Sequence, residues 1–131
     1  MKLIVRAFLT CVVCLIVVPA SLAKKPGAQP AVTVAGVYEN FTVGKGSGDL
    51  EGMRVVLVNA GGGHYAIVQI AQGGAEDPKP EFVPVTVKGL SVSFAVGDQK
   101  FTGTVTATGL RLKQEGGTTE TLRRKPCSSY L

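Results

Sequence analysis

The chain has 131 residues and a formal net charge of +5 at pH 7. It contains a single histidine and three cysteines, and two of the cysteines, Cys11 and Cys14, lie in an apolar run at the N-terminus. One histidine and the one remaining cysteine are too few for the three or four His, Cys or carboxylate ligands that a zinc site normally needs. Positive charge gathers at the two ends, whereas residues 36–120 carry 7 basic and 9 acidic side chains. This distribution predicts no basic face across the fold and argues against a nucleic-acid-binding protein.

The N-terminus has the three parts of a secretory signal. Lys2 and Arg6 supply positive charge, residues 7–18 form an apolar run, and small residues at Ser21 and Ala23 occupy the positions that a signal peptidase reads. The apolar run is too short for a membrane span, which needs about 20 residues. We therefore expect cleavage after Ala23, a periplasmic or secreted location, and no stable membrane span after cleavage.

Removal of residues 1–23 leaves 108 residues, which is enough for one domain and not for two. Residues 24–33 contain proline and glycine and predict a flexible tether, so the domain comprises residues 34–131. Cys127 is then the only cysteine left, because the other two lie within the signal. It cannot form an internal disulfide, and we expect either a free thiol or a Cys127-linked homodimer.

From residue 34 onward, apolar and polar residues alternate in short segments bounded by glycine, which is typical of half-buried β-strands. Glycine-containing turns such as Gly97-Asp98 suit tight antiparallel hairpins. The predicted strands are residues 36–43, 50–59, 64–71, 82–88, 90–96, 100–108, 110–114 and 118–124.

Short strands joined by connections too short for parallel crossovers predict an all-β fold. We expect a single small antiparallel up-and-down meander of about eight strands, either a barrel or a sandwich. Residues 50–59 and 65–70 are partly apolar on both faces, so we expect both of their sides to be covered. Most phenylalanines are expected in the core.

A barrel of about eight strands either fills its interior with side chains or holds one small ligand there. Val92, Phe94, Val105 and Ala107 lie on the predicted inner faces of two strands and would line such a cavity. A filled core is the default expectation, and the sequence does not decide between the two.

The longest predicted connection, residues 72–81, contains three acidic residues and two prolines. Loops of this kind often carry the contacts of a rigid β scaffold, so Glu76, Asp77 and Glu81 are candidate contacts for a protein partner. The same acids could gather around calcium, but their spacing does not match an EF-hand. We expect a solvated acidic loop and no metal site.

Few residues in the chain suggest catalysis. His64 begins a predicted strand, and no serine, cysteine or carboxylate can be paired with it from spacing. Residues 44–48 superficially resemble a phosphate loop, but they lack the Gly-Lys-Ser/Thr order and a following helix. The sequence therefore predicts no catalytic residue and no cofactor.

Several turn and strand segments share features with known proteins: residues 64–67, 73–78, 101–105, 109–110, 122–125 and 129–130. In these segments the chain resembles a loose group of small exported bacterial proteins of unassigned activity, which are similar to short lipocalin-like or calycin-like meanders. The resemblance implies bacterial export and a β meander, and it carries no catalytic residues. Leu131 departs from the pattern, because such proteins often have an aromatic residue after the final tyrosine. Cys127 is also unusual for these proteins.

These observations favour a non-enzymatic binding module outside the cytoplasm. Its expected partner is a small apolar ligand, a secreted protein, or a protein or other component of the cell envelope. One alternative is a protein inhibitor of a secreted hydrolase that acts through residues 72–81. A further alternative, the least favoured, is an enzyme that uses His64 with a carboxylate. None of these involves nucleic acid.

Overall fold

The computed structural model describes residues 31–74 and 78–126. Within these ranges the chain is all-β, as predicted, and contains no helix that could cross a membrane. All strand pairs are antiparallel. The strands are β1 (Gly36–Glu39), β2 (Thr42–Val43), β3 (Leu50–Ala60), β4 (Gly63–Gln72), β5 (Glu81–Lys88), β6 (Ser91–Val96), β7 (Gln99–Val105), β8 (Gly109–Gln114) and β9 (Thr119–Lys125).

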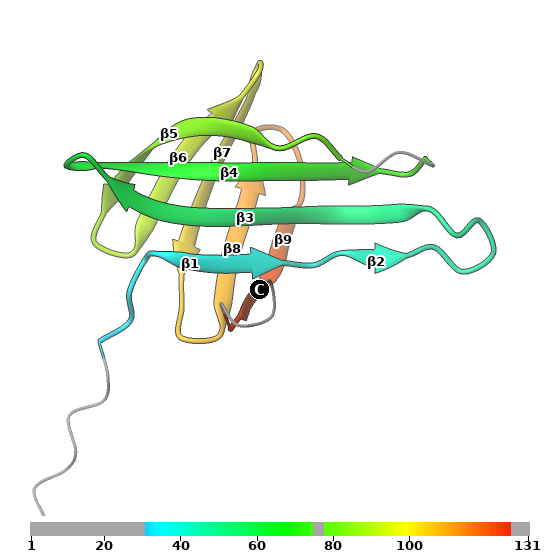
Figure 1. The fold of residues 1–131 in the computed structure, drawn as a ribbon, viewed down its shortest axis with the longest axis horizontal. Helices are drawn as coiled ribbons and strands as arrows, with labels where there is room; N and C mark the ends of the chain where they lie inside the picture. Colours follow the sequence, from blue (N-terminus) through cyan, green and yellow to red (C-terminus); the bar gives the residue numbers. More distant parts are fainter. Residues whose placement is uncertain (1–30, 75–77, 127–131) are drawn as a thin grey trace, which may run out of the picture.

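The strands form a closed barrel with one additional strand (Figure 1). Strands β3 to β9 pair in chain order as a meander, and β1 closes the sheet by pairing with β9 on one side and β3 on the other. The short strand β2 pairs with β3 alone and does not take part in the closure. Of the two arrangements expected from the sequence, the barrel is confirmed, and its closure leaves few free sheet edges.

The first predicted strand is broken where the chain crosses from β1 to β2. The amide of Asn40 donates to the carbonyl of Met53 over 3.1 Å, and the amide of Met53 donates to Asn40 Oδ1 over 2.7 Å. Gly52 permits this approach, because it has φ +106° and a Cβ there would lie 2.8 Å from the carbonyl oxygen of Asn40. The predicted strand 36–43 is therefore two strands with a local crossing between them.

The strand predicted over residues 100–108 ends at Val105, because a tight turn follows. The amide of Thr106 donates to the carbonyl of Gly109 over 2.7 Å, and the amide of Gly109 donates to Thr106 Oγ1 over 3.1 Å. Ala107 consequently lies in the turn and is exposed, not on the inner face of a strand as expected. The other predicted strand ends agree with the structure to within one residue.

The inward side chains form one hydrophobic cluster that fills the barrel. Phe94 and Phe101 are register partners whose rings stack within this cluster, with centroids 5.3 Å apart. No polar or charged side chain is buried in the described part of the chain. The cluster consists of Tyr38, Met53, Val55, Leu57, Ala66, Val68, Val83, Val85, Val92, Phe94, Val96, Phe101, Val105, Leu110, Leu112 and Leu122.

Arg124 attaches the segment that precedes β1 to the last strand of the barrel. Its guanidinium lies 5.0 Å from the ring centroid of Tyr38, and Nη2 donates to the Tyr38 hydroxyl over 2.6 Å. The guanidinium also donates to the main-chain carbonyls of Thr33 and Ala35. Residues 31–33, which were expected to belong to a flexible tether, thus include a direct contact with β9.

The Tyr38 hydroxyl makes the stability of the barrel sensitive to alkaline pH. Burial raises the pKa of Tyr38 above its usual value of 10.0, and the charge and hydrogen bond of Arg124 offset only part of that rise. The Tyr38 hydroxyl therefore loses its proton at a lower pH in the unfolded state than in the folded state. The free energy of unfolding falls as pH rises above about 10, because ionisation then stabilises the unfolded state more than the folded one.

We expect the stability difference between the wild-type protein and Tyr38→Phe to shrink as pH rises from about 8 to about 11. Phenylalanine has no ionisable group, so the variant lacks this part of the alkaline loss, and the comparison isolates it because the two proteins differ at this residue alone. Thermal unfolding at a series of pH values measures the difference. A constant difference across the range would show that Tyr38 does not resist ionisation.

The outer surface of the barrel differs from the expectation that β3 and β4 are covered on both sides. The barrel is a single layer, so its outward side chains have no second sheet against them in the described residues. Ile67 is 37% exposed, and Phe82 on the neighbouring strand is 64% exposed. Phe41 also lies outside the core, beneath the guanidinium of Arg54 at 5.1 Å from its ring centroid. Of the four phenylalanines that the structure describes, Phe94 and Phe101 confirm the expected core position.

Candidate functional site

The residues expected to line a ligand cavity fill the barrel instead. Val92, Phe94 and Val105 belong to the packed core, whereas Ala107 is exposed in the turn after β7. Among the described residues, the hollow that reaches toward the core beside Met53 has a volume of about 20 Å³. Such a volume suits one water molecule and no larger ligand.

The other residues singled out in the sequence do not come together in the described structure. Glu81 begins β5 and is exposed, whereas Glu76, Asp77 and Cys127 lie outside the described residues. His64 is half-buried in β4, opposite Asn59 of β3. The described part of the chain holds no group of three side chains that could bind a metal ion. A role for the acidic loop or for the Cys127 thiol stays a prediction.

A different group of residues, missed in the sequence, forms a coherent surface on the outside of β6, β7, β8 and β9. Its members alternate with buried core residues, so their side chains point away from the barrel. All are hydroxyl-bearing or cationic. We call this surface the hydroxyl–cation face, and it consists of Ser91, Ser93, Thr102, Thr104, Arg111, Lys113, Thr119 and Thr121.

The strand register arranges the hydroxyl–cation face in two rows that run across the four strands. In each row a cation on β8 lies between hydroxyls on β7 and β9. The first row is Ser91, Thr104, Arg111 and Thr121. The second row is Ser93, Thr102, Lys113 and Thr119. The two cations are two residues apart on one strand, which places their Cα atoms about 7 Å apart.

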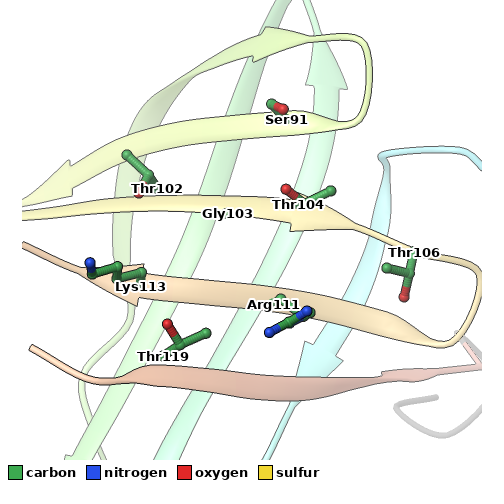
Figure 2. Close-up of a pocket in the computed structure, with 8 residues that line it drawn as sticks. All are labelled: Ser91, Thr102, Gly103, Thr104, Thr106, Arg111, Lys113 and Thr119. Atoms are coloured by element: carbon green, nitrogen blue, oxygen red, sulfur yellow. The ribbon is translucent and has the colours of Figure 1, made fainter.

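The hydroxyl–cation face is hollowed. A hollow of about 560 Å³ lies over β6 to β9 (Figure 2). A second hollow of about 330 Å³ shares Thr102 and Lys113 with it and continues toward the β8–β9 turn. Gly103 lets β7 and β8 lie close beneath the hollow, because a Cβ there would be 2.6 Å from the carbonyl oxygen of Arg111. The face is therefore an open, extended groove on a rigid sheet.

Among the residues that the structure describes, no acidic side chain forms an ion pair with either of the two cations. Strands β6, β7 and β8 contain no acidic residue. Glu115 in the next turn lies 3.6 Å from Lys100, at the end of the groove, and both side chains are 70% exposed. Glu120 of β9 alternates inward and accepts a hydrogen bond from Asn40 Nδ2 over 2.9 Å.

The expectation of no basic face stays a prediction, but the net charge of the chain does not reveal that these two cations share one wall, because side chains alternate along each strand. A charge count over residues 36–120 averages the two sides of the barrel and the turns, whereas β6, β7 and β8 contain no acidic residue. The signal was present in the sequence as Arg-x-Lys in residues 111–113 and Thr-x-Thr in residues 102–104. Separating each predicted strand into its two faces before counting charge would have revealed it.

Comparisons with known proteins give no match: no family model, no curated protein and no solved structure is significantly similar to the chain. The resemblance to lipocalin-like or calycin-like meanders therefore stays a prediction. What the protein binds has to be inferred from the chemistry of its own surface.

Proposed function

We propose that the protein is a non-enzymatic binding module that works outside the cytoplasm and binds an anionic polymer of the cell envelope through the hydroxyl–cation face. The observation that carries this proposal is the placement of Arg111 and Lys113 between hydroxyls on both sides, with no ion pair to an acid in residues 31–74 and 78–126. Guanidinium and ammonium groups bind carboxylate and phosphate oxygens by charge-assisted hydrogen bonds. Neighbouring serine and threonine hydroxyls can donate to the remaining oxygens.

The form of the surface favours a polymer over a small molecule. Small-molecule sites are concave pockets that enclose most of their ligand, whereas this groove is open and extends over four strands. Two cations about 7 Å apart can bind successive anionic groups of one extended chain. The filled interior supports the same choice, since it leaves the small apolar ligand expected from the sequence without a cavity among the described residues.

One feature of the hydroxyl–cation face, its lack of aromatic side chains, distinguishes the expected ligand from a nucleic acid. Proteins that bind single strands combine cations with aromatic side chains on which the bases stack. The hydroxyl–cation face carries hydroxyls and cations, and no aromatic residue lies among its members. We therefore expect a polymer whose anionic groups are carried by sugars or phosphates, with the hydroxyls contacting the oxygens of the repeat unit.

The test is a double charge reversal, Arg111→Glu with Lys113→Glu, in the purified protein. Each cation near an anionic surface is worth about 1 kcal/mol, so loss of both lowers the affinity by about 30-fold or more. Titration calorimetry at low salt measures binding to polygalacturonate and to inorganic polyphosphate. Affinity for the wild-type protein should fall as salt is raised, because screening weakens contacts between exposed charges.

The matched control reverses two exposed lysines elsewhere, Lys45→Glu with Lys79→Glu, and should lose less than about 3-fold in affinity. The proposal is wrong if the wild-type protein binds neither polymer at low salt. It is also wrong if the control variant loses as much affinity as the first. Tighter binding to single-stranded DNA than to both polymers would replace the proposal with a nucleic-acid function.

A further inference from the structure

The groove of the hydroxyl–cation face changes its chemistry at the end that lies beyond Lys113. The outward positions that follow Thr102 on β7 and Lys113 on β8 are Lys100 and Glu115, the second in the turn after β8. The amide of Glu115 donates to the carbonyl of Lys100 over 2.8 Å, which places these two residues side by side. The hollow of about 330 Å³ at this end is lined by Lys100, Thr102, Lys113, Gln114, Glu115 and Gly116.

The carboxylate of Glu115 is accessible to a ligand in this hollow. It lies 3.6 Å from the Lys100 ammonium, and both side chains are 70% exposed. An exposed ion pair of this kind contributes little to stability, so a ligand can take its place at small cost. The turn is held by its main chain, because the amide of Gly117 also donates to the carbonyl of Gln114 over 3.0 Å. The Glu115 side chain is therefore not needed to hold the turn.

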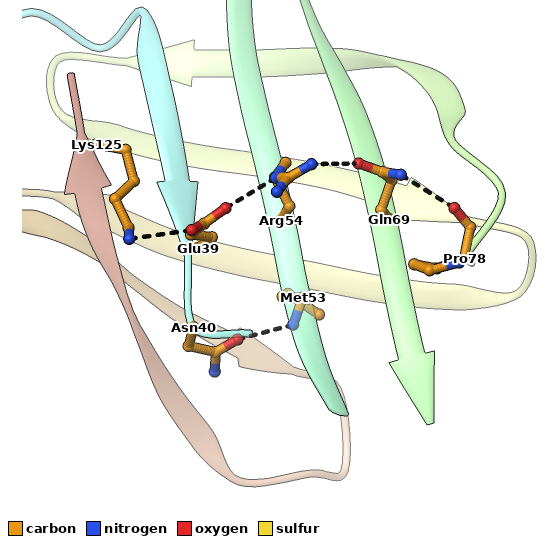
Figure 3. A network of polar contacts seen from close by, with 7 residues as sticks. All are labelled: Glu39, Asn40, Met53, Arg54, Gln69, Pro78 and Lys125. Carbon is orange, nitrogen blue, oxygen red and sulfur yellow. Dashed lines mark hydrogen bonds and ion pairs between the residues drawn. The ribbon is translucent and has the colours of Figure 1, made fainter. Parts of the chain in front are cut away.

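Glu39 shows the contrasting use of a carboxylate, within the wall of the barrel (Figure 3). Its side chain is 14% exposed and lies 2.8 Å from Arg54 and 3.1 Å from Lys125. Arg54 continues the network to Gln69, which donates to the carbonyl of Pro78. Glu39 thus links β1 to its two neighbours, β3 and β9. In the described residues Glu115 has one ion pair, the exposed one with Lys100, so its position in the groove calls for another explanation.

A carboxylate at the end of a cationic groove distinguishes two kinds of anionic polymer. Polyphosphate carries a negative charge on every unit and no hydroxyl along its chain, so Glu115 repels it. A polysaccharide of acidic sugars presents carboxylates and hydroxyls together. Its carboxylates can bind Arg111 and Lys113, and its hydroxyls can donate to the Glu115 carboxylate, which only accepts hydrogen bonds. A group that repels one candidate while it binds another is a source of specificity.

We infer that the polymer bound by the hydroxyl–cation face is an acidic polysaccharide and that Glu115 determines this specificity. The inference rests on the function proposed above and names the class of ligand. Outward positions two residues apart on a strand are about 7 Å apart, so a polymer that lies along β8 passes two cations and then reaches the carboxylate. Its repeat units have to combine anionic groups with hydroxyl donors, as acidic sugars do.

The test is Glu115→Ala in the purified protein, with titration calorimetry at low salt against polygalacturonate and inorganic polyphosphate. The wild-type protein should bind polygalacturonate more tightly. The variant should bind polygalacturonate about 5-fold more weakly, because the sugar hydroxyls lose their acceptor. It should bind polyphosphate about 5-fold more tightly, because a like charge is removed and Lys100 is released. A change of net charge alone would tighten the binding of both polymers.

Asp98→Ala is the matched control, since Asp98 is exposed in the β6–β7 turn and lies outside the residues that line the two hollows. It removes the same charge and should tighten the binding of both polymers by less than about 2-fold. Tighter binding of both polymers by Glu115→Ala, or tighter binding of polyphosphate by the wild-type protein, would overturn this inference and leave the proposed function standing. A wild-type protein that binds neither polymer would overturn both.

Discussion

Replacing Gly109 with alanine should cost the barrel at least about 3 kcal/mol of stability, a large part of what a small domain has. Gly109 begins β8 opposite Arg123 of β9, and a Cβ there would lie far inside van der Waals contact with the carbonyl oxygen of Leu122. That oxygen belongs to the main chain of a paired strand and cannot rotate away. The turn that precedes Gly109 is held by Thr106, so movement on that side would break two hydrogen bonds.

Urea unfolding followed by far-ultraviolet circular dichroism measures the effect. Gly117→Ala is the matched control, because Gly117 also lacks a positive φ and its added Cβ would come no closer than 3.3 Å to another residue, at Cβ of Gln114. We expect a change of less than about 1 kcal/mol at this exposed turn. Equal stability of the two variants would show that β8 and β9 do not approach as closely as described.

Replacing Arg124 with methionine should destabilise the protein by about 2–3 kcal/mol and release the segment before β1. The variant keeps much of the side-chain volume but removes the donors to the carbonyls of Thr33 and Ala35 and to the Tyr38 hydroxyl. Tyr38 is fully buried, so its hydroxyl would then depend on the carbonyl of Val34 alone. The cation over the Tyr38 ring is lost as well.

Two measurements separate these effects. Equilibrium unfolding gives the loss of stability, and hydrogen exchange should show faster exchange of the amides in residues 33–35, since their anchor is gone. Arg123→Met is the control, because Arg123 is exposed and should change stability by less than about 0.5 kcal/mol. If Arg124→Met behaved like Arg123→Met in both measurements, the anchoring role of Arg124 would be refuted.

Most of the fold could be predicted because each strand is marked by its own alternation of residues. Closure could not, since it depends on β1 pairing with two strands that are remote from each other in the chain. The position of Ala107 was missed for a local reason. Threonines continue to alternate through residues 102–108, although the main chain turns back after Val105. Alternation alone does not mark the end of a strand when the turn residues fit the same pattern.

The surface was harder to predict than the core. The apolar residues of β3 and β4 on both sides suggested a second covering layer, whereas the barrel has one layer and leaves Ile67 and Phe82 exposed. The cations Arg111 and Lys113 were hidden in a net charge that mixed both walls with the turns. In both cases the sequence contained the residues, but only the closed arrangement of strands determines which side chains share a wall.

The pairing of β1 with β9 joins segments 86 residues apart, since Tyr38 lies opposite Arg124. Such long-range contacts require an entropically costly loop closure, so β-rich chains with many of them fold slowly. A nascent or truncated chain that lacks its last strand presents two unpaired margins, on β1 and β8, which are templates for intermolecular strand pairing. The last strand of the barrel therefore protects the chain against aggregation only once it is in place.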